Sequence, residues 1–473
     1  MTITRATPAT AAEPDLDGQT AIPGAIPAAA DTPGPTGHAP EPDAPFDRSM
    51  RAIFRRPGFA LLWLSQAAGG LGEAVAQVAL PLLVYDLSGS ARLLGLFFVI
   101  QTLPRVILAP VAGLLADRLD RRRLMFGSDL GRAILVGLIP FTASLWQLAV
   151  LAALVSVGNA VARPAEQATV PVIAGTGLMV PALAVVQVSQ SLIRVIGPAI
   201  GALLVASAGP SRTFWLQTVC FAASAALIWR LRLPTASTAI APDPAAAAVS
   251  RRAELFAGLG VIWSNRVVRG ITAAEILWQV IGTMFVIGLV VYTEETIALG
   301  DRAETVFALL MATIAGGAAV GALVGNRIEP RIGRRRLLAI GYLGPLFLLP
   351  VGLVPPLPVV FACWFALGFT DAWAVIAMQA YLVEAVPDAL RGRMYAAWSA
   401  IITLAAAAWF AIVGLVVPVL GAPVVFVLAG LIVGIGGPLA LLLTGALATL
   451  RRGVDPAGRG SAPVTAGDGI GGP

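Results

Sequence analysis

The chain has 473 residues, of which 58% are hydrophobic and 12% are charged, and its formal net charge is +6. A soluble globular chain carries about 25% charged residues, so this composition excludes an ordinary water-facing surface and predicts a membrane protein. All 32 basic residues are arginines, and the single histidine is His38. The absence of lysine excludes a Walker-type ATP site, and the lone histidine argues against histidine-dependent catalysis and metal binding. The two cysteines, Cys220 and Cys363, lie in apolar stretches and indicate no disulfide framework or metal site.

Residues 1–50 are rich in proline, alanine, threonine and aspartate and contain almost no aromatic residues. Such a segment buries too little apolar surface to offset the entropy lost on ordering, so we expect a disordered N-terminal tail. It has no positive segment followed by an apolar stretch and therefore does not resemble a signal peptide. Residues 451–473 are expected to form a second disordered tail.

Between these tails the sequence contains twelve apolar stretches, each long enough for a membrane-spanning helix, which needs about 20 residues. In chain order they are residues 58–86, 91–115, 125–143, 145–168, 180–208, 211–232, 267–292, 304–326, 337–354, 357–383, 390–418 and 421–449. Residues 233–266 contain no full span. We therefore predict an all-α membrane protein with twelve transmembrane helices in two pseudo-symmetric halves, residues 51–232 and 267–450, which the linker 233–266 connects.

The arginines are distributed unevenly between the loops on the two sides of the predicted bilayer. Most lie before the first span, in the linker, after the last span, or in loops on that same side. Arg92, Arg212 and Arg302 lie on the other side. The positive-inside rule therefore predicts that both termini and the linker are cytoplasmic. Because topology accounts for the positive charge, no nucleic-acid partner is expected.

The two halves contain similar loops. PLLVYDLSG at the end of the first span is similar to GLVVYTEET at the end of the seventh. GLLADRLDRRRL after the second span is similar to GALVGNRIEPRIGRRRL after the eighth. These matches indicate an internal duplication. Transporters commonly consist of such repeats, with the substrate site between them near the middle of the membrane.

The loop between the second and third spans resembles a motif of the major facilitator superfamily, roughly G-x-x-x-D-R-x-G-R-R. The matching residues are Gly113, Asp117, Arg118, Arg121 and Arg122, while Asp120 stands where the family often has glycine. Longer stretches, including QTLPRVILAPVAGLLADRLDRRRL and VPDALRGRMYAAWSA, resemble the branch that includes enterobactin and macrolide exporters. The resemblance implies the twelve-helix major facilitator fold and transport by alternating access.

The fifth predicted span partly matches a further motif of drug antiporters in this superfamily. Gly197, Pro198 and Gly201 match it, whereas Ile193 and Ala202 replace its first and last glycines. Proline in the middle of a helix frees a backbone carbonyl and kinks the helix. The alternative interpretation is a kink that serves only packing.

The resemblance also implies that this loop is a cytoplasmic gate. Asp117 would face the helix that starts near 387–389, because a helix N-terminus favours a carboxylate. Arg118 or Arg121 would pair with a carboxylate such as Asp129 or Glu166. The alternative is that the arginines only set topology. The second-half copy is a weaker candidate because it lacks the aspartate; its residues are Arg331, Gly333 and Arg334.

Ionisable residues inside the predicted spans are costly and therefore informative. They include Glu73, Arg105, Arg194, Glu275 and Asp371. We expect them to face a central cavity and to pair with one another. A buried carboxylate can load and release a proton as the cavity changes side, so Glu73 and Asp371 are candidates for proton coupling. The alternative is a structural ion pair, such as Glu73 with Arg105.

These patterns predict a secondary active transporter in the cytoplasmic membrane of a bacterium. The resemblance favours proton-coupled efflux of a small amphipathic molecule, such as an antibiotic, drug or siderophore. Two alternatives stay open: a proton-coupled nutrient importer of the same fold, and a membrane receptor or assembly factor that transports nothing. We expect no enzyme activity, no cofactor and no metal, and we expect a monomer whose partners are the bilayer, its substrate and protons.

Overall fold

The computed structural model describes residues 52–232, 258–298 and 300–446, except the side chains of residues 109–118, 176, 180, 301, 388 and 389. These residues belong to one compact unit, Phe46–Pro473. The predictions for the two tails and for the first part of the linker lie outside the described residues. Every regular element within the described ranges is helical, which confirms the predicted all-α class.

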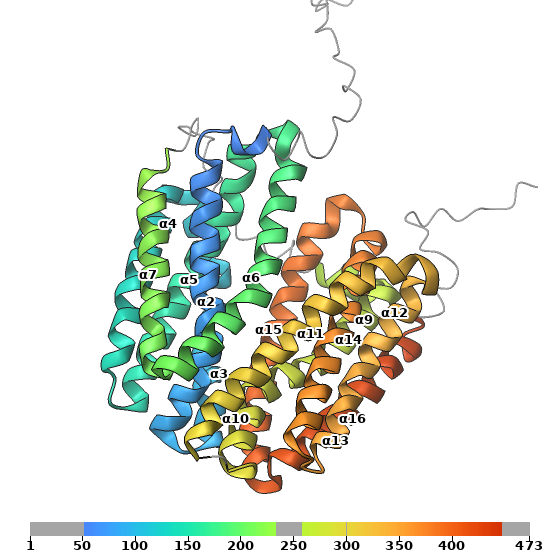
Figure 1. Ribbon diagram of the computed structural model, residues 1–473. Coiled ribbons are helices and arrows are strands. Elements are labelled where there is room, and N and C mark those ends of the chain that lie inside the picture. The colour runs from blue at the N-terminus through green and yellow to red at the C-terminus, as the bar shows by residue number, and fades with distance from the viewer. Residues whose placement is uncertain (1–51, 233–257, 299, 447–473) are drawn as a thin grey trace, which may run out of the picture. The chain divides into compact units, whose positions relative to one another are not determined.

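The first half contains six main helices, which Figure 1 colours from blue to green. They are α2 (Phe59–Ser88), α3 (Ala91–Arg118), α4 (Arg121–Leu138), α5 (Leu145–Ala174), α6 (Met179–Ala208) and α7 (Pro210–Arg230). The short helix η1 (Ile139–Phe141) extends α4, and η2 (Thr176–Leu178) precedes α6. Helix α2 packs against α6 and α7, while α5 packs against α3 and α4.

The second half contains six further helical segments, several of them composite. They are α9 (Arg266–Thr283) with η3 (Met284–Gly288), α10 (Leu289–Val291) and η4 (Tyr292–Thr296); α11 (Ala303–Ile332) after η5 (Gly300–Arg302); α12 (Arg334–Leu343) with η6 (Gly344–Phe347) and α13 (Leu348–Val351); α14 (Leu357–Ala385); α15 (Asp388–Leu420); and α16 (Ala422–Leu443). The segments η3 and η4 are π-helical. Wide π-helical turns are rare and often occur at functional sites.

Ten helices in the described part of the chain are long and apolar enough to cross a membrane. The two remaining predicted spans correspond to α7 and to α12 with α13. Helix α7 has 21 residues and carries Arg212 and Gln217 within its length. The other segment is interrupted at Pro345, which has no backbone N–H to continue the helix. By length and composition, the twelve-span prediction is therefore confirmed for ten helices. The polar residues within α7 and the interruption at Pro345 explain why the other two differ.

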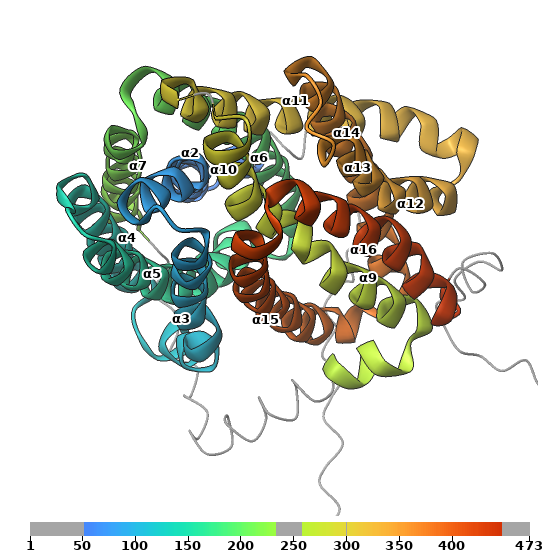
Figure 2. The ribbon, with the colours of Figure 1, turned by 90° about the horizontal axis from the view of Figure 1, so that it is seen from below.

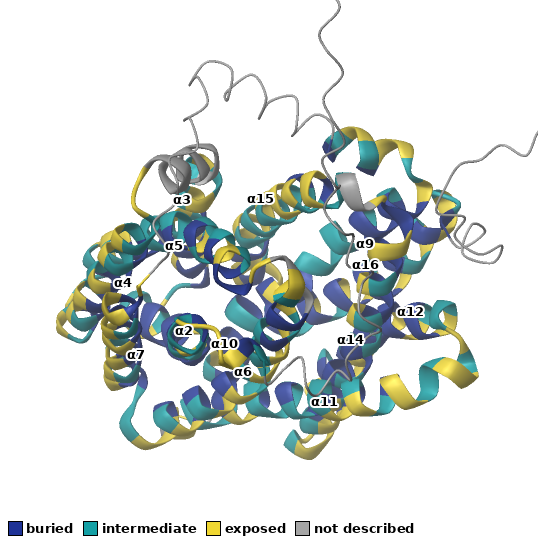
Figure 3. Cartoon of the chain, turned by 90° about the horizontal axis from the view of Figure 1, so that it is seen from above, coloured by how far each residue is buried: buried dark blue, intermediate teal, exposed yellow. Residues whose placement is uncertain are grey.

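Large apolar side chains are exposed along these helices, as a lipid environment requires. Examples are Ile134, Trp146, Leu203 and Leu323. Figure 3 shows exposed residues along the outward sides of α4, α7 and α12, with buried residues on their inward sides. The surface therefore fits a bilayer better than water, in agreement with the low charge content.

The last part of the predicted linker is structured. Residues 258–264 are helical, and Ile262 is fully buried. The side chain of Asn265 then caps α9 by accepting from the N–H groups of Val267 and Val268 at 2.9 and 3.2 Å. Its amide also donates to the carbonyl of Ala385 at 2.9 Å. The described end of the linker is therefore held against the second half.

The hydrophobic core differs between the two ends of the bundle, which we name the Phe59 end and the Ser88 end after the limits of α2. At the Ser88 end a single cluster contains residues of both halves, such as Leu82 and Phe307. At the Phe59 end one cluster lies within the first half around Phe59, and another lies within the second half around Leu338. Among the described residues, the halves thus share a core only at the Ser88 end.

Direct contacts between the halves also lie near the Ser88 end. The Cα of Gly95 on α3 lies 3.0 Å from the position that a Cβ of Gly414 on α15 would occupy. The rings of Phe98 and Phe410 stack with centroids 5.0 Å apart. Figure 2 shows α3 and α15 beside each other. The hydroxyl of Tyr85 donates to Oε1 of Glu295 and joins α2 to η4.

Candidate functional site

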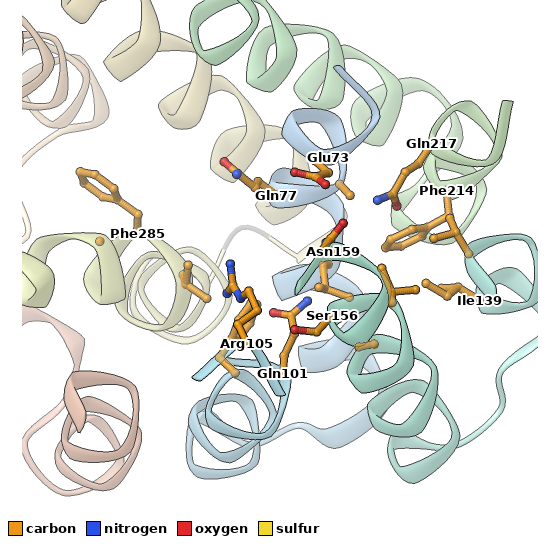
Figure 4. A pocket seen from close by; sticks show the side chains of 18 of the residues that line it. Glu73, Gln77, Gln101, Arg105, Ile139, Ser156, Asn159, Phe214, Gln217 and Phe285 are labelled. Atoms are coloured by element: carbon orange, nitrogen blue, oxygen red, sulfur yellow. The ribbon is translucent and has the colours of Figure 1, made fainter. Parts of the chain in front are cut away.

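A cavity of about 360 Å³ lies within the bundle and is lined by both halves. Most of its lining comes from α2 to α5 and α7, and the second half contributes Gly282, Phe285, Val286 and Met311. Figure 4 shows the polar lining residues, which are Glu73, Gln77, Gln101, Arg105, Ser156, Asn159 and Gln217. Aromatic rings of Phe98, Phe214 and Phe285 complete the wall. Apolar walls with a few polar groups are typical of small-molecule sites.

Glu73 projects from α2 to this cavity and is bound by two arginines. Nη2 of Arg163 on α5 donates to Oε2 of Glu73 at 2.5 Å. Nη1 of Arg132 on α4 donates to Oε1 at 3.3 Å. The alternative of a structural ion pair between Glu73 and Arg105 is therefore not formed, because Arg132 on α4 and Arg163 on α5 bind both carboxylate oxygens.

Arg132 is the centre of a wider buried network. Its side chain is 4% exposed, and that of Asp129 is 1% exposed. Nη2 of Arg132 donates to Oδ1 of Asp129, whose Oδ2 accepts from Ser224 on α7. Nη2 also lies 3.8 Å from Oε1 of Glu166. The guanidinium stacks over the ring of Phe221 with its carbon 4.4 Å from the centroid.

A second, small cavity of about 30 Å³ lies on the other side of Glu73. Its lining is almost entirely polar and includes Ser65, Gln66, Arg163, Glu166 and Gln190. Such a volume is large enough to hold a water molecule. Glu73 borders both cavities. The Glu73 network thus separates the main cavity from a polar space nearer the Phe59 end.

Arg105 faces the main cavity, where Arg163 and Glu73 are near enough to interact with it electrostatically. Among the described residues it donates no hydrogen bond and forms no ion pair within 4.0 Å. Figure 4 shows its side chain beside that of Gln101, both reaching from α3 into the cavity. Arg105 is therefore placed to meet a group on a bound molecule.

Glu275 and Asp371 lie together in the second half, away from Glu73. The hydroxyl of Tyr342 on α12 donates to Oε1 of Glu275 on α9 at 2.8 Å. Asp371 on α14 is close enough to interact electrostatically with both of these groups. Of the membrane charges expected to pair with one another, Glu275 and Asp371 lie together but carry the same sign, while Glu73 pairs with Arg132 and Arg163 instead.

Arg194 stands apart from both clusters. Its side chain is exposed and donates to the hydroxyl of Ser191 on the same helix at 2.8 Å. It is not part of the lining of the main cavity. Arg194 is therefore not among the residues that line the main cavity in this conformation, and its expected role at a central cavity stays a prediction.

The motif Gly197, Pro198 and Gly201 brings α6 close to α2 beside Glu73. A Cβ on Gly197 would overlap that of Ala74, and a Cβ on Gly201 would lie 2.7 Å from the carbonyl oxygen of Val75. Pro198 lies within α6. Only glycine permits this approach, so the motif positions the helix turn that follows Glu73.

The structure describes only part of the loop motif between α3 and α4. Gly113, Asp117 and Arg118 lie on α3, but their side chains are outside the described residues, as is that of Asp388. Nη1 of Arg121 donates to the carbonyl of Ala168 at 3.4 Å. Of the predicted pairing of Arg118 or Arg121 with a carboxylate such as Asp129 or Glu166, the Arg121 alternative is not formed, since Arg132 contacts both carboxylates; the Arg118 alternative lies outside the described side chains.

Arg122 ties α4 to the end of α7. Its Nε donates to the carbonyl of Ile228 at 3.3 Å, and its Nη2 donates to that of Trp229. Its guanidinium also lies 5.5 Å from the ring centroid of Trp229. Asp120, the departure from the motif, caps α4 by accepting from the N–H of Arg123 at 3.1 Å.

The second-half copy of the motif forms contacts within its own half. Nε of Arg334 donates to Oε1 of Glu329 at 2.6 Å, and its Nη1 donates to Glu384. Gly333 adopts a positive φ of 82° between α11 and α12, and Arg331 is exposed at the end of α11. These contacts join α11, α12 and α14 at the Phe59 end.

Sequence reasoning missed Arg132, Arg163 and Asn159 as members of the site. A signal was present, because Asp129 and Arg132 are three residues apart in an apolar span. Asn159, Arg163 and Glu166 likewise follow a spacing that places them on one helix face. Within the described residues, no group of three His, Cys, Asp or Glu side chains could hold a metal ion.

The family of this chain follows from comparison with known proteins. A family model described as Major Facilitator Superfamily matches residues 62–349 and 296–469. The chain belongs to the major facilitator superfamily. Superfamily membership confirms the family resemblance found in the sequence, and it agrees with a twelve-helix transporter architecture.

Several relatives of this superfamily member are exporters by name. The multidrug efflux pump Tap of Mycolicibacterium fortuitum is 27% identical over 353 residues, which cover 72% of this chain and 84% of that protein. Macrolide efflux protein A of Streptococcus pyogenes is 27% identical over 31% of this chain and 37% of that protein. The MFS-type transporter YfiS of Bacillus subtilis is 31% identical, and the match spans 44% of its length.

Solved structures of other transporters share the fold of this superfamily member. The nucleoside transporter NupG superposes with a TM-score of 0.60 at 10% identity, covering 84% of this chain and 99% of NupG. A POT family transporter superposes with a TM-score of 0.63 at 14% identity, covering 82% and 96%. At such identities the likeness concerns the fold. The relatives and structural neighbours are transporters, in agreement with the prediction that the chain is not an enzyme.

Proposed function

We propose that this superfamily member exports a small amphipathic molecule across the cytoplasmic membrane of a bacterium in exchange for protons. The observation that carries the proposal is the cavity between the halves, whose wall combines three phenylalanine rings with amide side chains and Arg105. Such a wall suits a molecule with both apolar and polar surfaces. The efflux function of Tap and of macrolide efflux protein A supports the outward direction.

The proposed orientation places the Phe59 end in the cytoplasm, with both termini on that side. Arginines gather at this end on several helices: Arg121, Arg122, Arg230, Arg266, Arg331, Arg334 and Arg393. The positive-inside rule supports this assignment. With this orientation, the divided core at the Phe59 end corresponds to a state in which the halves are held together on the outer side. In alternating access the opposite state would join the halves at the Phe59 end and part them at the Ser88 end.

The gate assignment is part of this proposal. We propose that Gly113, Asp117 and Arg118 of α3 join the halves when the Phe59 end closes, while Arg121 and Arg122 hold α4 to its neighbours. The contacts of Arg121 and Arg122 with the ends of α5 and α7 support a fixed position for this loop. We propose the two halves as residues 51–232 and 267–450, acting as a monomer.

The test uses inside-out membrane vesicles that respiration acidifies, with a pH-sensitive dye inside. A panel of amphipathic drugs and siderophores is added one compound at a time. Proton release that requires this protein supports the proposal and names the substrate class. If no compound releases protons, while right-side-out vesicles accumulate a nutrient with protons, the export proposal is contradicted and the importer is supported.

A further inference from the structure

The second half contains an acidic pair that no basic side chain neutralises. Glu275 on α9 accepts from Tyr342 on α12, and Asp371 on α14 interacts electrostatically with both. Within the described residues, no arginine lies within 4.0 Å of either carboxylate. Two carboxylates that share a weakly solvated site do not both ionise readily, so such a pair tends to hold a proton.

Close helix packing fixes the geometry of this pair. Glycines flank Tyr342 on α12 and lie against the residues that flank Asp371 on α14. A Cβ on Gly341 would lie 2.5 Å from the backbone nitrogen of Ala374, and one on Gly344 would overlap Thr370. Tyr342 is fully buried, and its ring packs edge-on against Trp278 with centroids 5.6 Å apart. The hydroxyl therefore has little freedom to leave Glu275.

The charged groups of the surrounding helices lie elsewhere. Helix α16 carries no titratable residue between Ala422 and Leu443. Apart from the pair and Tyr342, the titratable residues away from the Phe59 end are Cys363 on α14, Glu304 on α11, and Tyr292, Glu294 and Glu295 in η4. The others lie near the Phe59 end: Arg266 and Arg269 on α9, Arg327, Glu329 and Arg331 on α11, Arg334, Arg335 and Arg336 on α12, Tyr381 and Glu384 on α14, and Arg391, Arg393 and Tyr395 on α15. Cys363 lies on α14 two turns from Asp371.

The negative charge of Glu73, by contrast, is balanced by arginine side chains. Its two oxygens each accept from a different guanidinium, at 2.5 and 3.3 Å. Both carboxylate oxygens of Glu73 are thus already paired with positive groups, whereas the acidic pair in the second half has no arginine within 4.0 Å among the described residues.

Helix α9 connects this pair to the rest of the transport machinery. Gly282 and Phe285 line the main cavity two to three turns beyond Glu275 on the same helical segment. That segment widens into π-helical turns at Met284–Gly288 and Tyr292–Thr296, and its end supplies Glu295, the partner of Tyr85. A change of charge at Glu275 thus acts on an element that reaches both the cavity and the contact between halves.

We propose that Glu275 and Asp371 together form the binding site for the coupling proton, with Tyr342 as its positioning residue. This assignment rests on the proposed proton-coupled export and deepens it by placing the proton and the substrate in different halves. Glu73 with its arginines then shapes the substrate cavity and does not carry the proton.

The first arm of the test detects the proton directly by infrared spectroscopy of the purified full-length protein during a pH titration. A protonated carboxyl group has a carbonyl band that disappears when the group ionises. The band that titrates should be lost in Glu275→Gln and in Asp371→Asn. It should persist in the matched control Glu304→Gln and in Glu73→Gln. An unchanged band in both pair variants, or its loss only in Glu73→Gln, overturns the assignment.

The second arm measures transport in proteoliposomes with a compound from the vesicle screen. Asp371→Asn and Glu275→Gln should lose proton-driven efflux at least tenfold but retain exchange of labelled for unlabelled substrate without a gradient. Tyr342→Phe should shift the pH profile of efflux, and Glu275→Asp should restore part of the rate. A purely structural role would lower both modes equally and leave the pH profile unmoved.

The two experiments distinguish a failure of the proposed proton site from a failure of the proposed export function. If wild-type protein shows the titrating band but no proton-driven efflux, the proton site stands and the export proposal fails. If proton-driven efflux persists in both pair variants, export stands and the assignment of the proton site is overturned.

Discussion

Charged residues at the cavity differ mainly in whether other protein groups already bind them. Glu73 and Arg132 are bound to several partners. Arg105 faces the same space and interacts electrostatically with Arg163 and Glu73, but among the described residues it has no hydrogen bond and no ion pair within 4.0 Å. A guanidinium that has lost part of its hydration and has no hydrogen-bonded protein partner gains most from a polar group on a bound molecule. Arg105 is therefore the residue on which substrate recognition should depend most.

Replacing Arg105 by glutamine should weaken substrate binding about tenfold or more, because a hydrogen bond to a charged group contributes about 1.5–3 kcal/mol. Binding of a transported compound to the purified protein, measured by equilibrium dialysis, checks this expectation. Arg194→Gln is the matched control, since Arg194 is exposed and bonds to Ser191 on its own helix. Equal losses of affinity in the two variants would contradict the role of Arg105.

Arg132 should matter for stability more than for recognition. Arg132→Met leaves the buried Asp129 with Ser224 as its remaining partner, and an uncompensated buried charge costs about 3–5 kcal/mol. The thermal unfolding midpoint in detergent should therefore fall clearly. Arg123→Met is the control, because Arg123 is 90% exposed in its pair with Asp120 and surface pairs contribute about 0–1 kcal/mol. Similar midpoints for both variants would speak against the network.

At the scale of helices, the approach of α6 to α2 controls where Glu73 is held. Gly197 and Gly201 face Ala74 and Val75, the two residues after Glu73. A side chain at either glycine must push the helices apart, since the obstacle includes backbone atoms. The antiporter-like motif thus has a packing role that can be measured separately from any kink at Pro198.

Gly201→Ala should lower transport several-fold and destabilise the protein by about 1–3 kcal/mol through overpacking. Gly127→Ala on α4 is the control, because a Cβ there would meet nothing within 4 Å and alanine favours a helix by up to about 1 kcal/mol. Initial rates of efflux and unfolding midpoints check both effects. Full activity of Gly201→Ala would show that the close approach is dispensable.

The helices themselves could be predicted well from sequence because each requires a long apolar stretch. The deviations have local causes. Pro345 breaks one span into short pieces. The π-helical turns of η3 and η4 follow no proline or glycine rule from which they could be predicted. The helical end of the linker was missed because residues 258–264 are too short to register as a span.

The site was harder to predict because its contacts join helices far apart in sequence. The sequence placed Glu73 and Arg105 near mid-membrane, and both do line the cavity. Which arginine reaches Glu73 depends on how α4 and α5 rotate against α2, and no local pattern encodes that rotation. The same holds for Glu275 and Tyr342, which are separated by 67 residues and meet through the packing of α9 and α12.

At the scale of the whole transporter, the Ser88 end is held by contacts between halves. Tyr85 donates to Glu295 there, next to a shared hydrophobic core. Glu294 and Glu304 interact electrostatically with Asp86, so this end also carries like charges that oppose closure. The hydrogen bond from Tyr85 to Glu295 therefore opposes the electrostatic repulsion between these carboxylates. Its removal should favour the state in which the Ser88 end is open.

Tyr85→Phe should increase the population that is open at the Ser88 end. Spin labels at Arg92 and Arg302, in a background without Cys220 and Cys363, report the separation of the halves by electron resonance. A larger fraction of long distances is expected in the variant than in the parent. Tyr395→Phe is the control, because its hydroxyl contacts Gln379 within one half at 3.2 Å. Identical distance distributions would show that the hydrogen bond from Tyr85 to Glu295 does not hold the Ser88 end closed.

The divided core at the Phe59 end also bears on how the chain is made. Each half has its own apolar cluster there, one around Phe59 and one around Leu338, and neither cluster needs the other half. During synthesis the cluster around Phe59 can therefore form while the ribosome still extends the second six helices. The shared cluster at the Ser88 end takes residues from both halves, so it can be completed only after the second half has been made.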